Sequence, residues 1–322
     1  MRLGTRASAL ALAQAQLVAQ RLEAEQGAGA VEIVPILTRG DRESAAVDDS
    51  AGALTGDGPQ GEPPPGEDKS RWVSELERAL AAGEIDLAVH SAKDVPGELG
   101  DGLALLAAPP RAAVADVLCG AGGLDELPSG ARIGTSSLRR IAQLCAFRDD
   151  LQPVSMHGNV DTRLRKLADG EFDAIVLARA GLARLGREQA VSAVLDPARF
   201  VPAPGQGTLA LEGRRGDAAV GEAAAAIGDA DTMSCLLAER ALARSLDASC
   251  DTPLGALAQV DGENEMLLRA WIGLPDGSAW IADELSGAAG DPQALAQALA
   301  ARLEAAGARA LLDAAANAAR TR

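Results

Sequence analysis

The chain has 322 residues, a formal net charge of −16 and 48% hydrophobic residues, which is enough for two or three domain cores. Aromatic residues make up 2% of the chain and Tyr is absent, so the cores must consist of Ala, Leu and Val. The acidic balance argues against a general nucleic-acid or membrane-surface role. No apolar run reaches transmembrane length, and the N-terminal residues lack an apolar signal segment. We therefore expect a cytoplasmic protein that binds neither nucleic acid nor membranes.

The cysteines and histidines disfavour a metal or disulfide protein. The four cysteines are Cys119, Cys145, Cys235 and Cys250, and no two of them have CxxC spacing. The chain contains two histidines, His90 and His157. We expect no metal site.

The first elements form an α/β unit. Residues 2–6 predict a strand, and residues 10–25 predict a helix that Ser8 is placed to cap. A helix N-terminus beside Arg6 attracts anions, although an ordinary capped helix is a common alternative. Residues 31–37 predict the next strand.

Residues 42–68 are rich in Gly, Pro and Asp and show little apolar periodicity. This composition predicts a mobile loop that could serve as a lid. Lys69 follows the loop, and Ser70 is placed to cap a helix that extends to about residue 82.

A short apolar strand over residues 84–89 then runs into His90, Ser91, Lys93 and Asp94. Ligands of open α/β sheets bind outside the carboxyl ends of strands. A cation beside a carboxylate at such a place suits chemistry in which positive charge develops on a substrate. A strand end with solvated charges is an equally good interpretation of this stretch alone.

A second α/β unit begins at residues 131–134 and continues into Thr135-Ser136-Ser137 and a helix to residue 147. Hydroxyl groups at a strand-to-helix turn, followed by Arg139 and Arg140, resemble a carboxylate or phosphate cradle. We favour this interpretation over a capped helix with two solvated arginines.

Two segments predict crossings between the lobes, at residues 97–115 with Pro109-Pro110 and at residues 201–207. Residues 208–212 predict a strand that returns to the first sheet. From residue 230 the pattern changes to a helix, three short antiparallel strands with a hairpin at 275–277, and a helical stretch over 292–318. We expect lobe 1 at 1–109 plus 206–228, lobe 2 at 110–205, and a C-terminal α+β domain at 229–322.

These motifs, in this order and over nearly the whole chain, resemble the porphobilinogen deaminase (hydroxymethylbilane synthase) family. The resemblance rests on the stretches Gly4-Thr5-Arg6-Ala7-Ser8, Thr38-Arg39-Gly40-Asp41, His90 to Pro96, Gly134 to Arg140, Gly158-Asn159-Val160 with Thr162-Arg163, Gly205-Gln206-Gly207, and Ala238-Glu239-Arg240-Ala241 before Cys250.

The resemblance implies two periplasmic-binding-protein-like α/β lobes, a smaller C-terminal domain and a monomer. It implies a transferase of tetrapyrrole and heme biosynthesis that joins four porphobilinogen units, with loss of ammonia, into hydroxymethylbilane. It further implies a dipyrromethane cofactor held by a thioether to Cys250.

The family's site residues transfer to matching positions of this chain. Asp94 is the expected catalytic carboxylate, with Lys93 beside it. The expected cofactor-binding residues are Cys250, Arg139, Arg140, Lys93, Ser91, Thr135, Ser137 and Asp94. The expected substrate-binding residues are Arg6, Ser8, Gln14, Lys69, His157, Arg163, Arg184 and Gln206.

The chain departs from the family pattern at several places. His157 stands where the family usually has Arg, and Ala248-Ser249 replaces a pair of glycines before Cys250. The loop at 42–68 is longer and more acidic than the family's, and a lysine expected shortly before Lys69 is absent. A non-catalytic polycarboxylate-binding protein and an inactive homologue remain as alternatives, and the position of Cys250 argues against the first.

Overall fold

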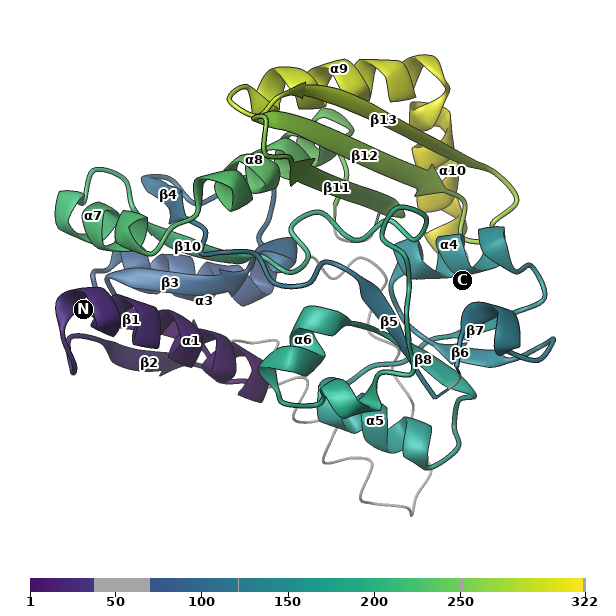
Figure 1. Ribbon diagram of the computed structural model, residues 1–322, viewed down its shortest axis with the longest axis horizontal. Helices are drawn as coiled ribbons and strands as arrows, with labels where there is room; N and C mark the ends of the chain where they lie inside the picture. The colour runs from purple at the N-terminus through teal and green to yellow at the C-terminus, as the bar shows by residue number, and fades with distance from the viewer. Residues whose placement is uncertain (38–69, 121, 250–251, 321–322) are drawn as a thin grey trace.

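The structure is a computed structural model that describes residues 1–37, 70–120, 122–249 and 252–320. It contains two five-stranded sheets and a three-stranded sheet. In Figure 1 the first sheet is purple and blue except for the green strand β10, and the second is mostly teal. The third sheet, in green, lies at the top with the yellow helices α9 and α10.

The first sheet has the strand order β2-β1-β3-β10-β4. Strand β1 pairs in parallel with β2 and β3, whereas β10 runs antiparallel between β3 and β4. The strand expected at 208–212 therefore does return to the first sheet, as predicted. The bounds are β1 Arg2–Arg6, β2 Glu32–Ile36, β3 Leu87–Ser91, β4 Leu103–Ala107 and β10 Leu209–Arg214.

Helices α1 (Ala9–Gln26), α3 (Ser70–Ala81) and α7 (Ala218–Ala226) accompany this sheet. Helix α1 forms because Ala and Leu favour helix and because Ser8 caps it, with its Oγ accepting from the Ala11 N–H at 3.4 Å. Its buried face packs on the sheet in one core cluster that includes Val18, Leu22 and Leu87. The predicted helix and its cap are confirmed.

The second sheet has the order β7-β6-β8-β5-β9, and β5 runs antiparallel to both of its neighbours. Its strands are β5 Asp116–Cys119, β6 Arg132–Gly134, β7 Gln152–Val154, β8 Ala174–Ala178 and β9 Ala193–Val194. Its helices are α4 Leu138–Phe147, α5 Val160–Ala168 and α6 Arg179–Arg184, with short 3-10 turns at Leu124–Glu126 and Glu188–Ala190. The chain passes between the two sheets twice, from β4 to β5 and from β9 to β10.

The third sheet is antiparallel in the order β11-β12-β13, as the hairpin signal predicted. Its strands are β11 Leu254–Val260, β12 Glu265–Gly273 and β13 Trp280–Ala288, and its helices are α8 Ala230–Ser245, α9 Pro292–Ala305 and α10 Ala308–Arg320. The helical stretch expected over 292–318 is broken at Gly307, whose φ of +101° ends α9. Two α/β lobes and a C-terminal α+β domain confirm the predicted fold class.

Three expectations fall outside the described residues: the loop at 42–68, Lys69 and Cys250. The motif at residues 38–41 lies there too. Among the described helices, none combines the length and the apolar character that crossing a membrane requires.

Candidate active site

Parallel strands of both lobes end at candidate site residues. Arg6 is the last residue of β1, and Ser91 ends β3 just before the 3-10 turn Ala92–Asp94. In the second lobe, Thr135 follows β6 directly, and Arg184 is the last residue of α6, which follows β8. This is where ligands bind in open α/β sheets.

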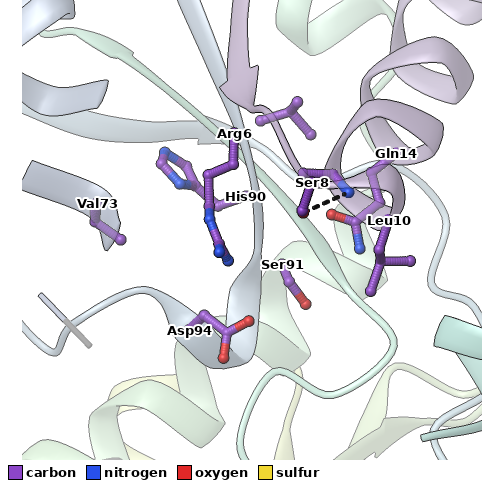
Figure 2. A pocket seen from close by; sticks show the side chains of 10 residues that line it. Arg6, Ser8, Leu10, Gln14, Val73, His90, Ser91 and Asp94 are labelled. Atoms are coloured by element: carbon purple, nitrogen blue, oxygen red, sulfur yellow. Dashed lines mark hydrogen bonds between the residues drawn. The ribbon is translucent and has the colours of Figure 1, made fainter. Parts of the chain in front are cut away.

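A cavity of about 60 Å³ brings the first-lobe residues together (Figure 2). Five of the expected site residues line it: Arg6, Ser8, Gln14, Ser91 and Asp94. The Arg6 side chain points from the end of β1 toward Ser91 and Asp94 in Figure 2. Five further lining residues were not among the expected site residues: Leu10, Ala11, Val73, Val89 and His90. The sequence placed His90 at the end of strand β3 but assigned it no role in the site.

Backbone contacts fix the turn that carries Lys93 and Asp94. The Ala92 N–H donates to the carbonyl of Thr208 at 3.0 Å, which ties the turn to the residue before β10. The guanidinium of Arg240 on α8 donates to the carbonyls of Val95, Pro96 and Gly97 at 3.1, 2.7 and 3.0 Å. The C-terminal domain therefore helps to position the turn in lobe 1.

The Gly205-Gln206-Gly207 motif fits against this turn. Gly205 and Gly207 have φ of +74° and +86°, a region in which side chains are strained. A Cβ on Gly205 would approach the Ala92 carbonyl carbon at 2.9 Å, and one on Gly207 would meet the Ala112 carbonyl oxygen at 2.6 Å. The two crossing segments and the turn can pack this closely because both positions are glycine.

A buried pair of titratable side chains lies at the wall of the cavity, where His90 is a lining residue. His90 Nε2 is 2.9 Å from Oε2 of Glu212 on the neighbouring strand β10, and the two side chains are 4% and 0% exposed. Neither carboxylate oxygen of Glu212 has a hydrogen-bond partner, because the contact with His90 is close but not aligned as a hydrogen bond. The imidazole is therefore the stabilising polar neighbour of a buried carboxylate. The sequence could not predict this pair, because His90 and Glu212 are far apart in the chain and meet only through the pairing of β3 with β10.

Asp116 of β5 holds the arginine pair of the second lobe. Arg139 and Arg140 donate to its two oxygens, each at 2.7 Å, and all three side chains are buried. The arginines also donate to the carbonyls of Val201 and Val176 at 2.8 and 2.9 Å. They are thus neither solvated nor presented in an open cradle. Among the side-chain nitrogens of these two arginines, the buried Nε atoms alone have no hydrogen-bond partner within the described residues.

The charge of this cluster explains how Asp116 tolerates burial. Burial alone would raise the pKa of its carboxyl, but the charges and hydrogen bonds of the two arginines hold that pKa far below its ordinary range. Gln206 adds a third donor to Asp116 at 3.0 Å and is 1% exposed. Neither Gln206 nor Asp116 lines the cavity of Figure 2.

The three hydroxyl residues before α4, Thr135, Ser136 and Ser137, make different contacts. Thr135 is fully buried, and its Oγ1 accepts from the Ser137 N–H at 3.3 Å. Ser136 donates to the Met156 carbonyl at 2.8 Å. Ser137 occupies the N-cap of α4 without using its side chain as a cap.

Two half-buried arginines, Arg163 and Arg184, have no counter-ion among the described residues. The pKa of Arg163 is lowered to about 10, mainly by burial and further by the charge of Arg140. The pKa of Arg184 is also lowered to about 10, mainly by burial and further by the charge of Arg21. Their hydrogen bonds go to the carbonyls of Gly158 and Gly207, at 2.8 and 2.7 Å. In the described part of the chain no carboxylate pairs with either, so both favour an anionic ligand.

His157 is exposed at the start of the turn before α5, and its Nε2 lies 3.0 Å from the Ser155 hydroxyl. The protein around the ring lowers the pKa of His157 first by desolvation and then through the charges of Arg163 and Lys166. Asn159 caps α5, with its side-chain oxygen accepting from the Thr162 N–H at 2.9 Å. Across the described residues, no group of three His, Cys, Asp or Glu side chains could hold a metal ion.

Comparison with known proteins identifies the family. Residues 1–222 match the profile "Porphobilinogen deaminase, dipyromethane cofactor binding domain", and residues 233–305 match "Porphobilinogen deaminase, C-terminal domain". Porphobilinogen deaminases from Roseiflexus castenholzii and Roseiflexus sp. are 43% and 44% identical over 312 residues, covering 96% of this chain and 97% of each relative. That from Thiobacillus denitrificans is 43% identical over 314 residues, covering 97% of both chains. The chain belongs to the porphobilinogen deaminase family, the transferases that join four porphobilinogen units, with loss of ammonia, into hydroxymethylbilane on a dipyrromethane cofactor.

Proposed function

We propose that Asp94 is the catalytic carboxylate of this transferase and that Lys93 is the cation beside it. Positive charge develops on the substrate as ammonia leaves, and a fixed carboxylate stabilises that charge. The cavity supports this role, because it places Asp94 with Arg6, Ser8 and Ser91 around one small space. The turn held by Thr208 and Arg240 keeps the carboxylate in position.

Arg163 and Arg184, which no carboxylate of the described residues pairs with, carry the proposal that anionic pyrroles occupy the cleft. Each pyrrole unit brings an acetate and a propionate, so the ligand supplies the carboxylates that these half-buried guanidinium groups lack. The remaining proposed substrate contacts are Arg6, Ser8, Gln14, His157, Lys69 and Gln206.

The same residues fit the dipyrromethane cofactor, which carries carboxylates of the same kind. When bound, the cofactor supplies the pyrrole on which the chain of units is built. We assign its attachment to Cys250. The residues proposed to hold it are Ser91, Lys93, Asp94, Thr135, Ser137, Arg139 and Arg140. Asp116 fixes the direction of the two buried arginines.

The intact mass of the denatured protein tests the attachment. Protein purified from a host that makes porphobilinogen should carry the extra mass of two pyrrole units, and Cys250→Ser should lose it. Cys145→Ser, a change at a partly exposed thiol, should keep the extra mass. An unmodified parent protein, or a modified Cys250→Ser variant, would contradict the assignment.

We further propose a cytoplasmic monomer that binds neither nucleic acid nor membranes. Support comes from the thiols of Cys119 and Cys235, which form no disulfide within the described residues, since disulfides are rare in the reducing cytosol. The net charge of −16 adds to it. Sedimentation velocity should give one species with the mass of a single chain.

A further inference from the structure

Half of the chain's aromatic residues gather at one place outside the active site. The sequence contains three Phe and three Trp. Phe147, Trp271 and Trp280 line a groove of about 420 Å³, together with Arg199 and Arg269. Trp and Arg side chains are enriched where proteins bind ligands and partners, and the volume lies in the usual range for small-molecule sites.

The groove lies where the C-terminal domain meets lobe 2. Phe147 ends α4, and Arg199 precedes Phe200 in the second crossing, whereas the two tryptophans lie on β12 and β13. Figure 1 shows α4 beside the end of β12. The hairpin after β12 fixes this contact, because a Cβ on Gly277 would come within 2.4 Å of the α4 backbone at Cys145 and Ala146.

The two tryptophans provide a flat apolar wall. Their rings stack with centroids 6.4 Å apart and an interplanar angle of 18°. Trp271 is buried in a small core cluster with Ala142 and Val201, but Trp280 is 53% exposed. A planar ring can therefore stack on the exposed part of Trp280.

Of the two arginines that line the groove, Arg269 has a carboxylate partner and Arg199 has none among the described residues. Arg269 pairs with Glu284 at 2.7 Å, and Asp283 pairs with Arg302 at 2.7 Å. Arg199 instead lies 5.5 Å over the Phe147 ring, and no carboxylate of the described residues pairs with it. An additional carboxylate would complement this exposed guanidinium in a bidentate geometry.

We propose that this groove is a second binding site, for a planar aromatic carboxylate that stacks on Trp280 and pairs with Arg199. Such a ligand would contact lobe 2 and the C-terminal domain together and so stabilise their contact. The site is separate from the active-site cavity and shares no lining residue with it.

Calorimetric titration of the holoenzyme with 2-naphthoate, and with neutral 2-naphthamide, tests the proposal. Arg199→Gln should weaken 2-naphthoate at least tenfold and leave the weaker binding of 2-naphthamide unchanged. Trp280→Leu should weaken both, with folding verified by circular dichroism. Arg184→Gln serves as the matched control, because its cation belongs to the catalytic cleft.

Three outcomes would overturn the proposal. The parent could fail to bind 2-naphthoate. Arg184→Gln could weaken it while Arg199→Gln does not, which would place the ligand in the active site. The parent could also sediment as a dimer that Trp280→Leu dissociates, which would show that a second copy of the chain covers the groove.

Discussion

At the scale of single residues, Asp94 is the side chain on which turnover should depend most. Asp94→Asn keeps the shape of the side chain but removes the charge that stabilises a developing cation. We expect turnover to fall by about a hundredfold or more, the usual effect of losing such a contact, with an unchanged circular dichroism spectrum. Asp101→Asn, at an exposed turn of the same lobe, should leave turnover unchanged. A loss of only a few-fold in Asp94→Asn would exclude it as the catalytic carboxylate.

His157 should make substrate affinity depend on pH. Its pKa lies below the ordinary value of about 6.5 in the unliganded protein, so the ring is neutral above that pH. Because the pKa of His157 is lower in the folded protein than in the unfolded chain, the unfolded chain binds a proton on this ring more readily. The stability that His157 contributes is therefore present above about pH 6.5 and is lost as the pH falls. A protonated ring also adds a positive charge for substrate carboxylates, so affinity should improve on the acidic side.

We therefore expect the KM of the parent for porphobilinogen to rise as the pH increases from about 5.5 to about 7. His157→Arg keeps its charge over this range and should give a flat profile with a low KM, whereas His157→Gln should be flat with a high KM. Superimposable profiles of the parent and His157→Arg would show that His157 carries no substrate charge.

At the scale of elements, the sequence predicted most strands and helices, and the reasons for the misses are physical. Strand β4 (Leu103–Ala107) lies in a Gly- and Pro-rich stretch, and only its pairing with β10, about a hundred residues later, makes it a strand. Arg6, Asp94 and Thr135 could be predicted as site residues because each lies at the carboxyl end of a strand. Asp116 and Glu212 could not, because their partners come from distant parts of the chain.

Asp116 should be the main electrostatic support between β5 and α4. Asp116→Asn leaves two buried guanidinium groups without a carboxylate, and breaking a buried pair in this way typically costs about 3–5 kcal/mol in the free energy of unfolding. Asp161→Asn removes the exposed pair with Arg187 and should cost less than about 1 kcal/mol. Urea denaturation compares the two variants. Equal losses would mean that the buried cluster contributes no more than a surface ion pair.

At the scale of the whole molecule, Glu239 on α8 joins all three parts of the chain. Its carboxylate is fully buried and accepts from Arg111 in the first crossing, at 2.8 and 3.1 Å. It also accepts from the Gly205 N–H in the second crossing at 2.6 Å and from the Ala258 N–H of β11 at 2.7 Å. The next residue, Arg240, holds the backbone after Asp94, so the same helix links the lobe junction to the turn that carries Asp94.

Glu239→Gln should therefore disturb both stability and catalysis. A glutamine keeps one acceptor oxygen but places an NH₂ group where a backbone N–H donates, and it leaves the Arg111 charge without its partner. We expect a loss of about 3–5 kcal/mol in the free energy of unfolding, together with lower turnover in the folded fraction, because α8 positions the turn of Asp94. Glu222→Gln, a change on α7 outside this junction, is the matched control and should alter neither quantity. Urea denaturation and single-turnover kinetics on the same preparations separate the two effects. If Glu239→Gln lowered stability but left turnover unchanged, the junction would support the fold without positioning the catalytic turn.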